Sequence, residues 1–184
     1  MDKLDYLMSR LDIIDCINRI ARGVDRLDRD IFRSGYHDDA ILDFGTHIGS
    51  PEQHMDFFFD LHARAQTRTA HTICNHTCEI DGDTAHAESY VIGLFLNPDG
   101  ISARLLAGRY IDRLERRDGE WRIALRRCTS EVMFSGDASV GNSEYFRNMD
   151  FLRGLRSPSD VSYQRPLLLD QTPAGHRWPR TMED

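Results

Sequence analysis

Lysine is almost absent from this sequence: Lys3 is the only one among 23 basic residues. It lies close to the start of the chain, so no lysine is placed to form a Schiff base inside a core. A basic block is missing too, and the formal net charge is -7. Binding of nucleic acid requires a clustered positive surface. We therefore expect neither Schiff-base catalysis nor a nucleic-acid partner.

Long apolar runs are also absent. No stretch approaches the roughly 18–20 apolar residues that span a bilayer. The first residues, MDKLDYLMSRLDIIDC, lack the basic start and the continuous apolar segment of a secretory signal. No P-loop is present, which argues against nucleotide binding. The Gly-x-Ser-x-Gly nucleophile elbow of the α/β-hydrolases is absent as well. We expect a protein without a membrane partner, located in the cytoplasm.

Cysteine is scarce, and a reducing compartment would keep the few cysteines as thiols, so we expect no disulfides. Three residues, Cys74, His76 and Cys78, alternate along a predicted strand and so could share a zinc ion. Three ligands are few for a structural site, and cysteine is a common small buried residue. We therefore expect no metal at this position. The remaining cysteines are Cys16 and Cys128.

A second group of metal-ligating residue types is His37, Asp38 and Asp39. It falls between a predicted helix and a predicted strand, where aspartate favours tight turns. We interpret this group as a structural turn.

A long helical pattern opens the sequence. Leu7, Leu11, Ile14, Ala21 and Asp25 recur at spacings that place them on one face, together with Asn18, and predict a helix of roughly five to six turns. Leu4 and Ile17 extend the width of this face, which contains one carboxylate, Asp25.

Shorter elements follow this helix. The pattern predicts a second helix over residues 26–32 and a strand over residues 40–45. Pro51 at a first helical position, with Ser50 as its N-cap, predicts a further helix to about residue 65.

From residue 68 the pattern becomes that of β-structure. Four segments are separated by turns built on Asp-Gly: residues 68–80, 84–96, 103–115 and 121–134. Helices followed by hairpin-linked strands predict an α+β fold, in which the helices cover one face of a curved antiparallel sheet. We assign residues 1–135 to one domain. Residues 136–184 form an extension with a short helix near 144–152, which packs on the domain or on an oligomer interface.

The motifs and their order resemble the SnoaL-like family of the nuclear-transport-factor-2-like superfamily. They are GVDR, YHDDA, AHTICNH, DGDTAHAESY and GRYIDRLERRDGEWRI, spread over roughly residues 5 to 135. The resemblance implies a cone-shaped fold, with a strongly bent sheet wrapped on a long helix and a pocket open at one end. Members include polyketide cyclases, scytalone dehydratase, steroid isomerases and a hexachlorocyclohexane dehydrochlorinase, as well as subunits without catalytic activity.

The resemblance also implies site residues. The Asp–His pair of the family's dehydrochlorinase corresponds to Asp25 and His71, while the lysine that this enzyme carries five residues before its aspartate is replaced by Ile20. A pocket arginine of the last strand falls in ArgArgCysThr. Counting forward from Trp121 selects Arg126, and counting back from Phe134 selects Arg127.

Physical chemistry adds a reason for Asp25 to have a partner. A carboxylate on an apolar helix face is too unfavourable to bury alone, and His71 or a nearby arginine could pair with it. The alternative is an exposed Asp25 beyond the last turn, or one paired with Arg22 or Arg29. Strand alternation does not orient His71, because neither face of its segment is clearly apolar.

Four further residues are candidates for the pocket. Phe44 would form wall or core, His47 would lie at the pocket mouth or in solvent, and Tyr90 or Tyr110 would donate a hydrogen bond to a substrate oxygen if it faced the cone.

The leading hypothesis is a lyase or isomerase that requires no cofactor and acts on a small hydrophobic cyclic molecule. His71 would be the general base, Asp25 would orient it, and Arg126 or Arg127 would stabilise negative charge. The alternative is a non-catalytic ligand-binding or accessory subunit. Because relatives bury the outer face of the sheet against symmetric copies, we also expect a homo-oligomer, either a dimer or a trimer.

Overall fold

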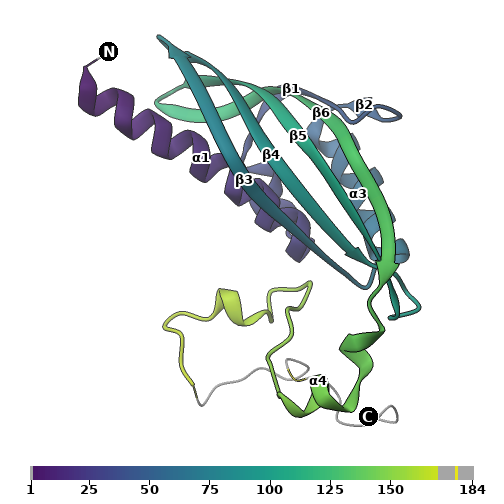
Figure 1. Ribbon diagram of the computed structural model, residues 1–184. Helices are drawn as coiled ribbons and strands as arrows, with labels where there is room; N and C mark the ends of the chain where they lie inside the picture. The colour runs from purple at the N-terminus through teal and green to yellow at the C-terminus, as the bar shows by residue number, and fades with distance from the viewer. Residues whose placement is uncertain (1, 170–176, 178–184) are drawn as a thin grey trace.

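The computed structural model describes residues 2–169 and 177, and it consists of one curved sheet with helices on its concave side (Figure 1). The sheet has six strands in the order β2-β1-β6-β5-β4-β3. In chain order the elements are α1 (Lys3–Arg26), α2 (Arg29–Arg33), β1 (Tyr36–Asp43), β2 (Ile48–Gly49), α3 (Pro51–Ala65), β3 (Arg68–Asp81), β4 (Thr84–Leu96), β5 (Ser102–Arg117), β6 (Glu120–Asp137), the 3₁₀ turn η1 (Ser139–Asn142), α4 (Glu144–Asn148) and the 3₁₀ turn η2 (Val161–Tyr163).

The four long strands form the predicted meander, and the α+β cone is confirmed. Strands β3 to β6 are antiparallel neighbours, joined by turns in which Gly82 and Gly119 adopt φ values of 58° and 82°. Such positive φ values favour glycine, which explains the Asp-Gly pattern. At the other side of β6, β1 pairs with it in the parallel direction, so the sheet is mixed at this edge.

Strand β1 begins earlier than predicted. It starts at Tyr36, so His37, Asp38 and Asp39 lie within a strand and the predicted turn is wrong. His37 is buried, with its Nε2 2.9 Å from the carbonyl oxygen of Glu115. Asp38 and Asp39 are exposed and pair with Arg33 and Arg117. The group is structural, through strand packing and surface ion pairs.

The buried face of α1 differs from the predicted one. Ile13, Cys16, Ile17 and Ile20 are buried against the sheet, with Ser9 one turn earlier, whereas Leu7 and Leu11 are exposed. The helix has two overlapping apolar faces. The buried one includes the small residues Ser9 and Cys16, which a search for large apolar side chains at helical spacing leaves out. Ile17 and Ala21 were placed correctly.

Helix α3 begins as predicted. The Ser50 side chain accepts a hydrogen bond from the Gln53 N–H, and the Gln53 side chain accepts one from the Ser50 N–H, which together form a capping box. Pro51 occupies the first turn. The helix therefore has a fixed start, and it lies behind β6 in Figure 1, in contact with β1 and β2.

The C-terminal extension packs on the ends of α1 and α3, beyond one end of the sheet (Figure 1). Arg22 donates to the carbonyl of Ser162, and the Tyr163 hydroxyl donates to Asp28 at 2.6 Å. Arg156 donates to the carbonyls of His62 and Gln66. Its short helix α4 ends at Asn148, earlier than predicted.

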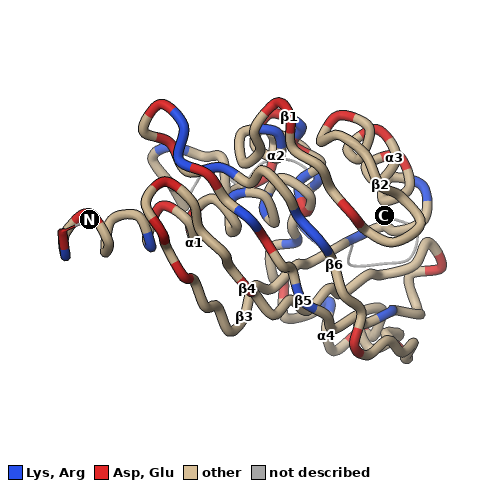
Figure 2. Tube along the Cα trace, turned by 90° about the horizontal axis from the view of Figure 1, so that it is seen from above, with Lys and Arg blue, Asp and Glu red and all other residues tan. Residues whose placement is uncertain are grey.

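Charged residues of both signs are interspersed along the strands (Figure 2). Arg109, for example, lies between Glu88 and Glu131, at 3.4 and 2.7 Å from their carboxylates. Within residues 2–169 no helix combines the length and the apolar character needed to cross a membrane. The cytoplasmic location and the absence of a nucleic-acid partner stay predictions.

Gly23 provides a test of how closely α1 and α2 pack. A Cβ atom at this position would lie 2.5 Å from the Phe32 nitrogen, which is backbone and cannot rotate away. Helix propensity alone favours alanine by about 1 kcal/mol. We predict the opposite sign: Gly23→Ala lowers the free energy of unfolding by about 1–3 kcal/mol, as overpacking does. Urea unfolding measures it, with Gly141→Ala, which meets no atom within 4 Å, as control.

Candidate functional site

A cavity of about 310 Å³ lies between the concave face of the sheet and the three N-terminal helices. Most of its wall is aromatic or aliphatic: α2, α3 and β4 contribute the rings of Phe32, Phe58 and Phe95, and the turn after β1 contributes that of Phe44. The polar side chains that reach it include His54, His62, Gln66, His71, Arg104, Tyr110 and Arg126. An apolar cavity with a few converging polar groups is the usual form of a small-molecule site.

His71 lines this cavity and is in contact with Asp25, which lies behind it. His71 Nδ1 donates to Asp25 Oδ1 at 2.7 Å, and the His71 backbone N–H donates to Asp25 Oδ2 at 2.8 Å. The Asp25 side chain is 14% exposed and the His71 side chain is 10% exposed. The expected partner of Asp25 is therefore His71, and the alternatives of an exposed Asp25 or a pair with Arg22 or Arg29 are wrong.

The hydrogen bond fixes the tautomer of His71. Because the carboxylate can only accept, Nδ1 carries the hydrogen, and in the neutral imidazole Nε2 then has the lone pair. Burial alone would raise the pKa of Asp25, but the hydrogen bonds and charge of His71 outweigh it, so the pKa lies below its usual range. Asp25 is thus a carboxylate at neutral pH, and the residue beside it presents a basic nitrogen. Nε2 has no hydrogen-bond partner among the described residues.

Arg126 also reaches the cavity, but its charge is already neutralised. It donates Nε and Nη2 to the two carboxylate oxygens of Asp112, each at 2.7 Å, and both side chains are almost completely buried. Asp112 and Arg126 are directly opposite each other in the β5–β6 register. Burial opposes the charged form of Arg126, yet Asp112 raises its pKa well above the ordinary value. The guanidinium carbon lies 4.1 Å from the centroid of the Tyr110 ring.

Arg127 does not belong to the site. It lies on the opposite face of β6, is largely exposed, and donates to Asp43 at 2.9 Å. Strand β6 contains two bulges, where Ala124 and Glu131 have no cross-strand partner. Each bulge shifts the alternation of faces by one residue, so orientation cannot be counted from either end of the strand.

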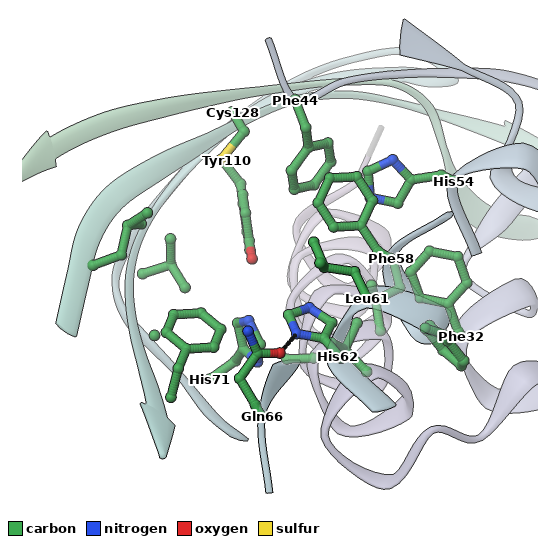
Figure 3. A pocket seen from close by; sticks show the side chains of 18 of the residues that line it. Phe32, Phe44, His54, Phe58, Leu61, His62, Gln66, His71, Tyr110 and Cys128 are labelled. Carbon is green, nitrogen blue, oxygen red and sulfur yellow. Dashed lines mark hydrogen bonds between the residues drawn. The ribbon is translucent and has the colours of Figure 1, made fainter. Parts of the chain in front are cut away.

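The four further candidates divide evenly. Phe44 and Tyr110 line the cavity, and the Tyr110 hydroxyl points into it (Figure 3). Burial raises the pKa of Tyr110, although Arg126 acts against this, so the phenol stays protonated. Tyr90 is wrong as a pocket residue because it is 46% exposed on the outer face of β4. His47 lies outside the cavity wall and stacks on Phe57 at a centroid distance of 4.7 Å.

A bulge in β3 also separates the possible zinc ligands. The β3–β4 register breaks between Ile73 and His76, and Cys74 is exposed while Cys78 is buried. His76 Nδ1 lies 2.9 Å from the Ser89 hydroxyl. Among residues 2–169 and 177 no group of three or more histidine, cysteine or acidic side chains is placed to hold a metal ion.

Helix α3 supplies two histidines, His54 and His62, that were not among the predicted site residues. His54, Phe58 and His62 follow one another at intervals of four, and this helical spacing was the available signal. His54 packs against Phe58 and Phe44, at centroid distances of 4.1 and 4.2 Å. His62 Nδ1 lies 2.7 Å from Gln66 Oε1, a contact visible in Figure 3. Burial lowers the pKa of His54 to about 3 and that of His62 to about 4.

Comparison with protein families gives one match. The model of the SnoaL-like domain matches residues 5–127. No curated protein matches the chain.

Solved structures resemble the chain over most of their own length. A hexachlorocyclohexane dehydrochlorinase described as LinA type 2 has a TM-score of 0.69 and 25% identity, over 74% of this chain and 95% of that one. LinA type 3 from Novosphingobium barchaimii LL02 has a TM-score of 0.68 and 25% identity, over 73% and 94%. A protein of unknown function with a cystatin-like fold from Nostoc punctiforme PCC 73102 has 0.58 and 20%, over 71% and 94%, and shows the fold alone.

The buried ion pair predicts a large loss on removal of one partner. Asp112→Ala leaves the Arg126 guanidinium buried without a counter-ion, so we expect the free energy of unfolding to fall by about 3–5 kcal/mol. Urea unfolding measures this loss. Asp43→Ala, which removes the partner of exposed Arg127, is the control and has a much smaller effect. Equal losses in the two variants would show that the pair at Asp112 is not isolated from solvent.

The two histidines of α3 predict a pH dependence. Their folded pKa values lie below the ordinary 6.5. Between pH 6.5 and about 4 the unfolded chain therefore binds more protons than the folded one. The free energy of unfolding thus decreases as the pH is lowered, by roughly 1 kcal/mol per histidine for each pH unit. We expect a flatter profile for His54→Phe, measured by urea unfolding from pH 7 to pH 5. His86→Ala, which alters an exposed histidine, should leave the profile unchanged; a parallel curve for His54→Phe would contradict the assignment.

Proposed function

The chain belongs to the SnoaL-like family, and from that premise we propose that it is a lyase or isomerase that removes a proton from a small hydrophobic cyclic substrate without a cofactor. The similarity of the LinA dehydrochlorinase structures supports this reaction class. The observation that carries the proposal is the contact between Asp25 and His71 at the wall of an apolar cavity.

His71 is the proposed general base. Its Nε2 holds a lone pair because Nδ1–H is bonded to Asp25. When Nε2 accepts a proton from a substrate carbon, the imidazolium is stabilised by the carboxylate 2.7 Å from Nδ1. The apolar wall strengthens this interaction and keeps bulk water from relaying the proton.

Tyr110 is the proposed donor to the negative charge that develops on the substrate. Its hydroxyl points into the cavity and has no hydrogen-bond partner among the described residues. The Arg126 guanidinium lies against the Tyr110 ring. Its positive charge stabilises the negative charge that develops on the phenol oxygen when Tyr110 donates its hydrogen bond to the substrate. Arg126 thus acts through Tyr110, while Asp112 holds it in place. The pair supplies a fixed dipole that needs no rearrangement during the reaction.

The reaction within this class depends on the substrate's leaving group. If the carbon next to the deprotonated one carries a leaving group, loss of that group gives an elimination. If no group leaves, return of the proton to a different carbon gives an isomerisation. Ile20 stands where the family's dehydrochlorinase has a lysine, and it contributes only apolar surface to the cavity. We therefore propose the class of reaction, and not dehydrochlorination itself.

A non-catalytic accessory role is the second candidate. In that role the cone would be filled by side chains, or Asp25 and His71 would be apart. The open cavity and the direct hydrogen bond favour the enzyme.

The dyad predicts the effect of two substitutions. A substrate is first selected by thermal shift among cyclic ketones, steroids and halogenated hydrocarbons, since a bound ligand stabilises the fold. We expect His71→Ala to lower kcat by about 10²–10⁴-fold, the range for a general base. Asp25→Asn should lower it through the loss of the fixed tautomer and of the charge beside the imidazolium.

Controls separate chemistry from folding. His86→Ala alters an exposed histidine of β4 and should leave kcat unchanged. Circular dichroism checks that each variant is folded. Near-normal turnover in both His71→Ala and Asp25→Asn would remove the mechanism.

A further inference from the structure

Arg104 is a cation in the cavity wall that has no anionic partner. It projects from β5 into the cavity and is partly buried. Its Nε is fully buried without a hydrogen-bond partner, and within residues 2–169 and 177 neither an ion pair nor a hydrogen bond involves its guanidinium. Its one described contact is with the face of the Phe95 ring, at 6.0 Å from the centroid.

The contrast with Arg126 is informative. Both arginines line the same cavity, but Arg126 binds Asp112 through two parallel hydrogen bonds, and Arg104 has no such carboxylate. The other carboxylate near the cavity, Asp25, already accepts two hydrogen bonds from His71. Partial burial of an unpaired guanidinium is unfavourable unless an anion comes to it.

The surroundings of Arg104 add positive charge. A second cavity, of about 330 Å³, shares Phe95 with the first and is lined by Arg26, Arg68 and Arg156. Burial lowers the pKa of Arg68, and the charges of Arg153 and Arg156 lower it further. Of the carboxylates near these arginines, Asp25 is bonded to His71 and Asp160 is paired with Arg26.

Arg104 and the proposed base His71 both lie next to the Phe95 ring. Its guanidinium lies over Phe95, and the Phe95 ring centroid is 5.5 Å from that of His71. A single ring thus separates the cation from the imidazole. A ligand with an apolar ring against Phe95 could place a negatively charged substituent at Arg104 and a C–H bond at His71 Nε2.

We propose that the substrate is a cyclic or aromatic carboxylic acid, and that Arg104 binds its carboxylate and determines this specificity. The inference rests on the proposed function, because it places the acid in the same cavity. The aromatic wall binds the ring, and the guanidinium gains the planar two-oxygen partner that Asp112 provides for Arg126. A neutral hydrocarbon would cover Arg104 without replacing its hydration.

The test compares acids with their amides, which have the same shape without the charge. Isothermal titration of the full chain measures the affinities of cyclohexane-, benzene- and naphthalene-carboxylates and of the matching carboxamides. We expect at least one acid to bind about 10–100-fold more tightly than its amide, the range for a hydrogen bond to a charged group. Arg104→Gln should remove this preference without weakening the amide, and Arg104→Lys should restore part of it.

Two control variants locate the anion. Arg127→Gln, on the opposite face of β6, should keep the full preference. Arg68→Gln, in the second cavity, should keep most of it. If Arg68→Gln abolishes the preference and Arg104→Gln does not, the anion binds in the second cavity and the assignment to Arg104 is wrong. If no acid in the panel binds more tightly than its amide, the inference is wrong.

Turnover distinguishes this inference from the proposed function. An acid preference that depends on Arg104, with turnover unchanged by His71→Ala, contradicts the mechanism and supports the inference. Turnover of a neutral ketone that requires His71, without any acid preference, contradicts only the inference.

Discussion

The Asp25 carboxylate ties the last turn of α1 to strand β3 through two hydrogen bonds from one residue, and the arrangement of the site depends on this contact. The backbone N–H of His71 fixes where the strand lies, and its ring N–H fixes how the side chain is turned. One carboxylate thus sets both the position and the tautomer of the imidazole. Close packing at Gly23, two residues earlier on α1, holds that end of the helix against α2.

Much of the fold could be predicted because local chemistry determines it. The Asp-Gly turns locate the long strands within a few residues, and Ser50 with Pro51 locates the start of α3. The face of each strand was harder to predict, because bulges in β3 and β6 interrupt the alternation. The inner face of β3 runs from His71 and Ile73 to His76 and Cys78, a set that no strict alternation contains.

The site could be predicted only in part, for a related reason. Asp25 and His71 were found through the resemblance, and the cost of burying a carboxylate alone pointed to a partner. The pairing of Arg126 with Asp112 depends on the register of two bulged strands, which distant residues determine. His54 and His62 were missed because their spacing on α3 is also that of ordinary core residues. Arg104 could not be selected from the sequence, because its lack of a described hydrogen-bond or ion-pair partner is visible only in the folded structure.

The extension after β6 has a consequence for how such a protein can diversify. The family match ends at residue 127, yet Gly154, Leu155 and Arg156 form part of the wall beside Asp25. This wall is attached through surface turns and a few hydrogen bonds to helix ends, so it can be lengthened, shortened or exchanged without altering the register of any strand. The wall of the second cavity and the proton chemistry are thereby encoded in separate stretches of the chain, and selection can act on the first while the second is inherited intact.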